Sequence, residues 1–239
     1  MYETDRQYMP RVGVDAAAFD EGLRSYMLGI YNYMASAVAL SGIVAFLVAG
    51  SPAVSQMLFG TPLKWVVIFA PIGLVMLMSF RFERMSKTAL LATFWVYAAL
   101  VGASLASILL VYTGASVARA FFVAAGMFAG VSIYGYTTKA DLTKFSTFLM
   151  MGLFGLIIAS LVNIFVQSSM MQFVISAVSV LVFCGLTAWD TQRLKDTYVE
   201  AAGTELEGKL SVMGALSLYL NFVNLFIALV QLFGGRREE

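Results

Sequence analysis

Asp190 is the residue of this sequence whose type and position most clearly suggest chemistry. It follows the largely apolar stretch 171–189 and stands in the segment CGLTAWDTQRLK. Removal from water favours the protonated form of a carboxylate, whereas a nearby Arg favours the ionised form. Asp190 is therefore either a proton-sensitive latch or the partner in a local ion pair with Arg193, which lies three residues on and on the same helix face. The residues alone leave both interpretations open.

Amide and hydroxyl side chains form a second polar group in apolar surroundings. Ser217, Asn221 and Asn224 are spaced so that they share one face of a helix, and Asn163 lies in another apolar segment. Such groups either make hydrogen bonds between membrane helices or line a hydrated, ion-coordinating interior. Because calcium takes amide and carboxylate oxygens as ligands, the strongest metal site that this set supports is a weak calcium site at Asp190.

Two further motifs are expected to be structural. Asp141, in YTTKADLTKFS, precedes an apolar run and is expected to cap a helix, because a carboxylate there accepts hydrogen bonds from free backbone N–H groups. Gly126 and Gly130, at GxxxG spacing, are expected to form a packing seam where two helices approach closely.

Composition excludes several classes of function. With no His, the chain cannot build a Ser/His/Asp triad or an HExxH zinc site, and its one cysteine, Cys184, cannot form a CxxC redox pair. A net charge of +1 offers no basic field for nucleic acid. No GxGD motif or pair of membrane-buried acids appears. We therefore expect neither enzymatic activity, nor a cofactor, nor nucleic-acid binding.

The elements that must position these side chains are membrane helices. The 239 residues are 60% hydrophobic and 12% charged, with a mean hydropathy of +0.84, which is too apolar for a soluble fold. Since a span needs about 20 apolar residues, the sequence predicts an all-α polytopic membrane protein. Its seven transmembrane helices are predicted at 26–49, 64–80, 88–112, 117–137, 145–166, 171–190 and 210–233.

Polar segments separate or flank these spans. Residues 1–25 are predicted to form a polar N-terminal tail with no cleavable signal peptide, and residues 234–239 a short charged C-terminal tail. The connection 191–209 is the one long polar loop that we expect. We therefore expect one transmembrane domain in a lipid bilayer and no room for a second domain.

The distribution of Lys and Arg predicts the orientation. Eleven of these residues fall on the side of the N-terminus and of the loops after spans 2, 4 and 6, against four on the other side. Because cytoplasmic loops are richer in Lys and Arg, the N-terminus is predicted to be cytoplasmic and the C-terminus to lie outside. The four on the other side are Lys64, Arg119, Arg236 and Arg237.

Three segments carry a resemblance to a known family. GYTTKADL at 135–142, CGLTAWDTQRLK at 184–195 and ALSLYLNFVNLF at 215–226 resemble signature segments of the transmembrane Bax inhibitor-1 motif family in a bacterial version. The likeness extends over all seven predicted spans. It implies a fold in which six helices surround a central seventh, and it implies a pH-sensitive calcium leak across a bacterial inner membrane.

The resemblance also implies a latch. Family members are attributed two acids, one in helix 6 and one in helix 7, held by an Arg at the end of helix 2. Asp190 matches the first acid and Arg84 resembles the Arg, with Arg81 as a competitor, but Asn221 stands at the second acidic position. Two nearby carboxylates share a proton and titrate as a pair, whereas Asp with Asn loses the like-charge repulsion. The gating by pH is therefore expected to be altered.

Two functions compete on these grounds. The first is a pH-sensitive leak channel or transporter for calcium, with Asp190, Arg84 and Asn221 as its gate. The alternative is a non-conducting regulator that binds a membrane-anchored ATP-dependent protease in protein quality control, with the polar residues 1–25 as the point of contact.

Overall fold

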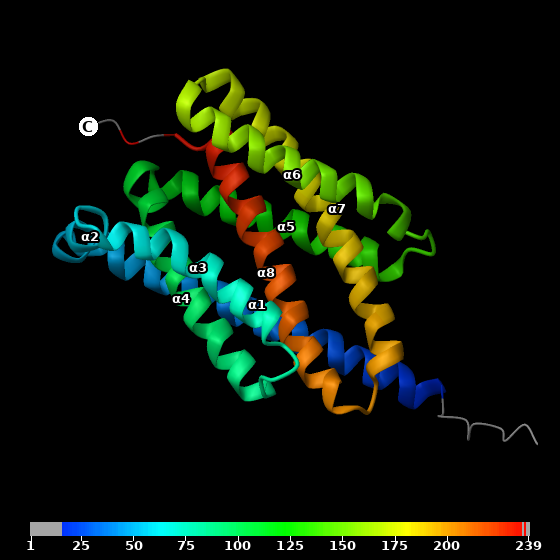
Figure 1. The fold of residues 1–239 in the computed structure, drawn as a ribbon. Coiled ribbons are helices and arrows are strands. Elements are labelled where there is room, and N and C mark those ends of the chain that lie inside the picture. Colours follow the sequence, from blue (N-terminus) through cyan, green and yellow to red (C-terminus); the bar gives the residue numbers. More distant parts are fainter. Residues whose placement is uncertain (1–15, 236, 238–239) are drawn as a thin grey trace, which may run out of the picture.

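The structure is a computed structural model that describes residues 16–235 and residue 237, and its regular elements there are helices (Figure 1). Seven of the helices in this part of the chain are long and apolar enough to cross a membrane, which confirms the seven predicted spans. A short additional helix, α2, lies in the connection between the first two spans. The helices are α1 (Ala16–Gly50), α2 (Pro52–Phe59), α3 (Leu63–Phe80), α4 (Lys87–Val111), α5 (Gly114–Thr137), α6 (Thr143–Val166), α7 (Ser169–Ala201) and α8 (Glu205–Phe233).

Two helices extend well beyond their predicted spans. Helix α1 begins at Ala16, within the predicted tail 1–25, of which residues 1–15 lie outside the described part of the chain. Helix α7 continues to Ala201, so the prediction of a long polar loop at 191–209 is wrong and only residues 202–204 separate α7 from α8.

These extensions are amphipathic, which is why a search for wholly apolar segments misses them. In α7, the buried side chains beyond Asp190 recur at helical spacing, and on α1 the first turns show the same pattern. The two extensions pack together, with the Tyr198 ring 5.4 Å from Phe19 and 5.1 Å from Tyr26, measured between centroids. The buried residues of the α7 extension are Thr191, Leu194, Tyr198 and Ala201.

Helix α8 occupies the centre of the bundle. In its most apolar stretch 72% of the residues are buried, against 11% in α6. It packs mainly against α1, α4, α5 and α7, while α3 lies on α4 and α6 lies on α7 (Figure 1). The resemblance implied six helices around the seventh, whereas the described structure surrounds α8 with four close neighbours and places two helices farther out.

Close helix contacts are made at other glycines than those predicted. A Cβ atom on Gly102 would lie 2.8 Å from the Cα of Ser41, so only glycine lets α4 approach α1 there. Gly135 makes the same kind of contact with Ala188 of α7. By contrast, a Cβ on Gly126 or Gly130 meets nothing within 4 Å. The predicted GxxxG packing seam is therefore wrong within this chain, because that face of α5 is turned away from the bundle.

Candidate functional site

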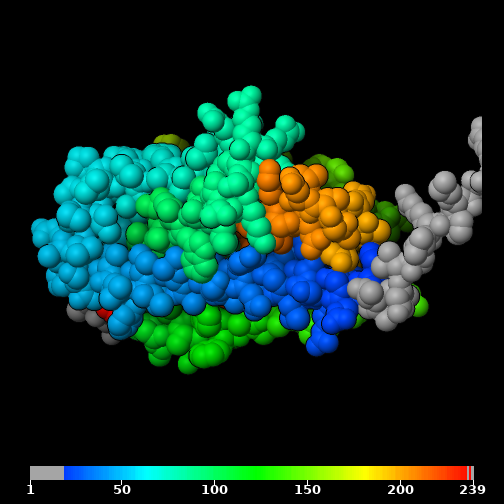
Figure 2. Space-filling view, turned by 90° about the horizontal axis from the view of Figure 1, so that it is seen from below, coloured from blue at the N-terminus to red at the C-terminus, as the bar shows by residue number. Residues whose placement is uncertain are grey.

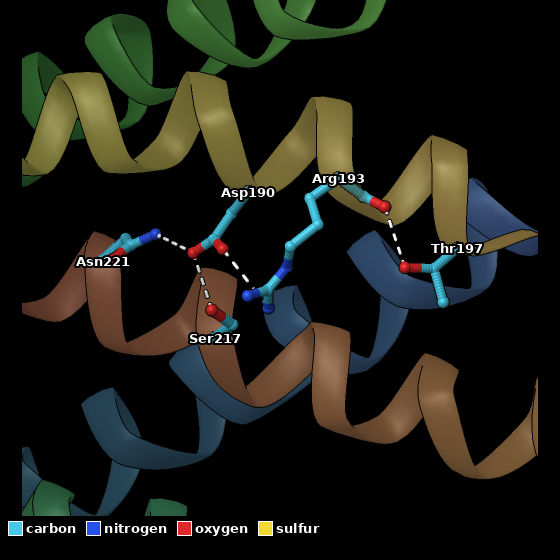
Figure 3. Close-up of polar contacts among 5 residues, drawn as sticks. All are labelled: Asp190, Arg193, Thr197, Ser217 and Asn221. Carbon is cyan, nitrogen blue, oxygen red and sulfur yellow. Dashed lines mark hydrogen bonds and ion pairs between the residues drawn. The ribbon is translucent and has the colours of Figure 1, made fainter. Parts of the chain in front are cut away.

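Asp190 joins the two helices α7 and α8. The residue is 4% exposed, and its Oδ2 accepts hydrogen bonds from Ser217 Oγ at 2.6 Å and from Asn221 Nδ2 at 2.8 Å (Figure 3). Both donors come from α8. Because Ser217 and Asn221 are four residues apart, they lie on one helix face and converge on a single carboxylate oxygen. The structure thus brings three of the predicted polar residues together.

The cation beside Asp190 is Arg193, not Arg84. Arg193 Nη2 lies 3.5 Å from Asp190 Oδ1 (Figure 3). The guanidinium also lies over the Trp189 ring, 5.0 Å from its centroid. Arg84 lies in the exposed turn between α3 and α4, and its neighbour Arg81 is equally exposed. Of the two interpretations of Asp190, the local ion pair is therefore present, and within the described residues the predicted contact with Arg84 is absent.

The surroundings of Asp190 explain why its position is fixed. Thr187 and Thr191, on either side in α7, are fully buried, and the Tyr31 hydroxyl of α1 lies 3.4 Å from Thr191 Oγ1. At Ala188 the α7 backbone packs directly on Gly135 of α5. The Asp190 side chain thus contacts α8, while its neighbours in α7 contact α1 at Thr191 and α5 at Ala188, so that α7 is packed on three helices at this level.

Asn163 and Asn224 do not belong to this cluster. Asn163, near the end of α6, donates from Nδ2 to Gln172 Oε1 at 3.1 Å and accepts from the backbone N–H of Ser168. Asn224 donates to the Leu220 carbonyl one turn earlier in its own helix. The predicted polar stripe is therefore divided between structural hydrogen bonds and the Asp190 cluster.

A second polar cluster, which the sequence did not predict, joins α7 to α8 at their other ends. Gln172 Nε2 donates to Gln231 Oε1 at 2.7 Å, and Ser176 Oγ donates to the same oxygen at 3.2 Å. Asn163 adds α6 through Gln172. The signal in the sequence is weak, because isolated Gln residues near span ends resemble ordinary polar flanks.

A third cluster holds α8 to α1 and α4. The Tyr219 hydroxyl lies 2.6 Å from Ser41 Oγ, and Ser41 Oγ lies 2.7 Å from the Ala98 carbonyl oxygen. Tyr219 is completely buried and packs edge-on against Phe94 and Tyr97. The segment LYLNF thus uses its Tyr to fix α8 on one side and its Asn to contact α7 on the other.

The predicted cap at Asp141 is present in a modified form. Asp141 Oδ1 accepts a hydrogen bond from the Thr143 N–H at 3.0 Å, which satisfies one free donor at the start of α6. The N-cap position itself is Leu142, whose side chain makes no cap hydrogen bond. Leu142 N–H instead donates to Gln192 Oε1 of α7 at 2.8 Å. Asp141 therefore supports the helix start from one residue farther out.

The Asp190 cluster is better suited to tying helices together than to holding a metal ion. Within residues 16–235 and 237, no three His, Cys, Asp or Glu side chains come together in a way that could bind a metal. Oδ2 of Asp190 is occupied by two donors from α8, and Oδ1 faces Arg193. A cation that bound here would have to displace Arg193.

Comparison with known proteins gives close relatives over nearly the whole length. The chain is 46% identical over 220 residues to a protein of Rickettsia prowazekii, covering 92% of this chain and 93% of that protein. It is 45% identical to a protein of Caulobacter vibrioides, covering 100% of both chains. It is 42% identical over 219 residues to the inner membrane protein YbhL of Escherichia coli, covering 90% of this chain and 94% of YbhL.

A family model described as inhibitor of apoptosis-promoting Bax1 matches residues 23–238. The match covers α1 from Leu23 onward and all of the helices α2 to α8, and it therefore includes the Asp190 cluster. Together with the seven apolar helices, these likenesses confirm the resemblance seen in the three sequence segments. This chain is a membrane protein of the Bax inhibitor-1 family.

Proposed function

We propose that this protein is a cation leak pathway, with calcium as the transported ion, and that Asp190, Ser217 and Asn221 form its gate. The observation that carries the proposal is the burial of Asp190, a charged group on a membrane helix that reaches across to the central helix α8. Ionisable side chains at such positions are costly and mark ion pathways more often than they mark packing contacts.

The gate opens when α8 separates from α7 at Asp190. In the closed arrangement a single oxygen, Asp190 Oδ2, accepts both hydrogen bonds from α8, so both are lost when this oxygen moves away. Loss of these hydrogen bonds removes the polar attachment of α8 to α7 at this level. A polar passage then lies between the two helices, with Asp190 available to attract a cation once Arg193 moves aside.

Asn221 makes this gate less sensitive to pH than a pair of acids. The amide of Asn221 does not ionise in this pH range, so the Asn221–Asp190 contact has no like-charge repulsion to release. We therefore expect a basal leak with a shallow dependence on pH in the wild-type protein.

Calcium influx into proteoliposomes tests the proposal. Asp190→Ala should raise the influx several-fold, because Ser217 and Asn221 lose their common acceptor. Asp196→Ala is the matched control, since Asp196 is an exposed acid on the same helix and makes no contact with the gate. If Asp190→Ala and Asp196→Ala both leave the influx and its pH dependence at the wild-type level, the gate is not at Asp190.

The proposal also covers the location and orientation of the protein. The protein acts in the bacterial inner membrane without a cofactor or an enzymatic reaction, and its N-terminus is cytoplasmic. If the folded wild-type protein conducts no calcium at any pH, the leak is excluded. A regulator of a membrane-anchored ATP-dependent protease then becomes the better description, and deletion of residues 1–15, which leaves α1 complete, becomes its test.

A further inference from the structure

A cavity of about 500 Å³ lies away from the Asp190 gate, at the end of the bundle where α1 and α4 finish and α5 begins. Helices α1 and α5 form its sides, α4 closes one wall and α8 forms its floor. Its size falls in the range of about 300–1,000 Å³ that is typical of small-molecule sites. Its lining includes Ala45, Phe46, Leu109, Ala118, Phe122 and Phe226.

The wall of this cavity is apolar. Its one polar side chain from a helix, Ser41, is already hydrogen-bonded to the Tyr219 hydroxyl and to backbone carbonyl oxygens. Phe46 and Phe122 at the rim are each 73% exposed, so the cavity opens on the outer surface of membrane helices and not toward an aqueous interior. Figure 2 shows α1 running along one face of the molecule. The cavity is therefore open to hydrocarbon chains of the bilayer.

Arg237, in the segment after α8, is a charged residue of the cavity lining. The segment after α8 is held against the α4–α5 connection by three hydrogen bonds: Thr113 N–H to the Gly235 carbonyl at 3.1 Å, Gly235 N–H to Ser116 Oγ at 3.0 Å, and Arg237 N–H to the Val111 carbonyl at 3.0 Å. Arg237 thereby becomes part of the cavity lining. It lies at the level where α4 and α8 end, which is where hydrocarbon meets lipid headgroups.

We propose that this cavity binds an anionic phospholipid, with one acyl chain between α1 and α5 and the phosphate at Arg237. The apolar wall matches the acyl chain, and a guanidinium matches a phosphate by charge and by paired hydrogen bonds. The C-terminal segment then has a defined role, because its backbone contacts fix the headgroup-binding residue at the mouth of the cavity. This site is separate from the gate and does not depend on conductance.

Lipid retention measured by native mass spectrometry tests the proposal. The purified full-length protein in detergent is mixed with equal amounts of phosphatidylglycerol and phosphatidylcholine, and the lipid that remains bound is identified. We expect one retained phosphatidylglycerol. Arg237→Gln should lower its preference over phosphatidylcholine about tenfold, the effect of losing one charged hydrogen bond. Arg119→Gln, which changes an exposed Arg outside the cavity, should leave the preference unchanged.

Filling the cavity tests the acyl chain. A Cβ atom on Gly42 meets nothing within 4 Å, so Gly42→Phe places its ring in the cavity, whereas Gly126→Phe adds the same ring to a free face elsewhere. Gly42→Phe should lose the retained lipid and Gly126→Phe should keep it. Ala118→Leu fills the same cavity if Gly42→Phe does not fold. Retention at the wild-type level in the folded filling variants, or no preference for phosphatidylglycerol in the wild-type protein, overturns the proposal.

Discussion

Helices α7 and α8 are joined by polar side chains at two levels, and the two levels differ in charge. Near one end, Asp190 accepts from Ser217 and Asn221. Near the other end, Gln231 accepts from Gln172 and Ser176. From Ser176 to Asp190 there are 14 positions of α7, or about 21 Å at 1.5 Å per residue. One level holds an ionisable group and an Arg, and the other is built from neutral amides and a hydroxyl.

The two clusters therefore differ in whether they contain a group that can ionise. Asp190 carries an ionisable carboxyl group, whereas the amide and hydroxyl groups of the Gln231 cluster do not ionise between acid and neutral pH. If the proposed gate opens at Asp190, we therefore expect the Gln231 cluster to keep α8 on α7 at the other end. Figure 3 shows the Asp190 side chain between Ser217 and Asn221 of α8 and Arg193 of its own helix.

We expect the strongest change in calcium influx when a second acid is placed beside Asp190. Asn221→Asp places a second carboxylate at the position of an amide that now donates to Asp190 at 2.8 Å. At low pH the two acids share a proton and stay joined; as pH rises the proton is lost, and repulsion opens the contact. Calcium influx should therefore rise about tenfold or more as the pH is raised.

Gln231→Glu is the matched control for that substitution. It puts an acid into the neutral cluster, where the nearest partners are amide and hydroxyl donors. Its pH profile in proteoliposomes should follow the wild type. Equal pH dependence in Asn221→Asp and Gln231→Glu would remove the distinction between the two levels.

The second prediction concerns Gly135 of α5, which packs against α7 close to Asp190. At Gly135, an added Cβ would lie 2.9 Å from the Cα of Ala188, two residues before Asp190, and the backbone cannot give way there easily. Gly135→Ala should lower the free energy of unfolding by about 2–3 kcal/mol, the usual cost of overpacking. Thermal unfolding in detergent, followed by circular dichroism, measures the change. Gly126→Ala has open space and should be neutral or slightly stabilising.

Removing one amide from each level should have a smaller and unequal effect on stability. Asn221→Leu leaves buried Asp190 with one donor fewer from α8, which should cost about 2 kcal/mol. Gln231 is exposed, so its hydrogen bonds contribute less to stability, and Gln231→Leu should lower the free energy of unfolding by about 1 kcal/mol. The same unfolding measurement compares them. A larger loss in Gln231→Leu than in Asn221→Leu contradicts the expected order.

The smallest effect is expected for the two Arg residues. Arg193 pairs with Asp190, but its side chain is 51% exposed, so screening by water limits the loss in Arg193→Gln to about 0.5–1 kcal/mol. Arg84→Gln should change neither stability nor calcium influx, because Arg84 lies in an exposed turn. An influx increase in Arg84→Gln that Arg193→Gln lacks would show that Arg84 reaches the gate in another conformation of the protein.

Much of this architecture was predictable because it depends on local composition. Apolar length identified all seven spans, and the four-residue spacing of Ser217 and Asn221 correctly placed them on one face. The ends of α1 and α7 were missed because their extensions are amphipathic, and a wholly apolar criterion rejects them. Gly126 and Gly130 were misjudged because spacing alone does not tell which face of α5 meets a neighbour.

That the chain is a helical membrane protein, and that Asp190 is its most unusual charge, can be read from the residues alone, because both conclusions follow from counting polar groups in apolar segments. Which residues meet that charge depends on how the helices pack. Ser217 and Asn221 are 27 and 31 residues away along the chain, and Arg84, an equally plausible partner by type, is turned to solvent. The reason is physical: helical periodicity fixes the face on which a side chain lies, whereas the packing of α7 on α8 and α5 fixes what that face contacts.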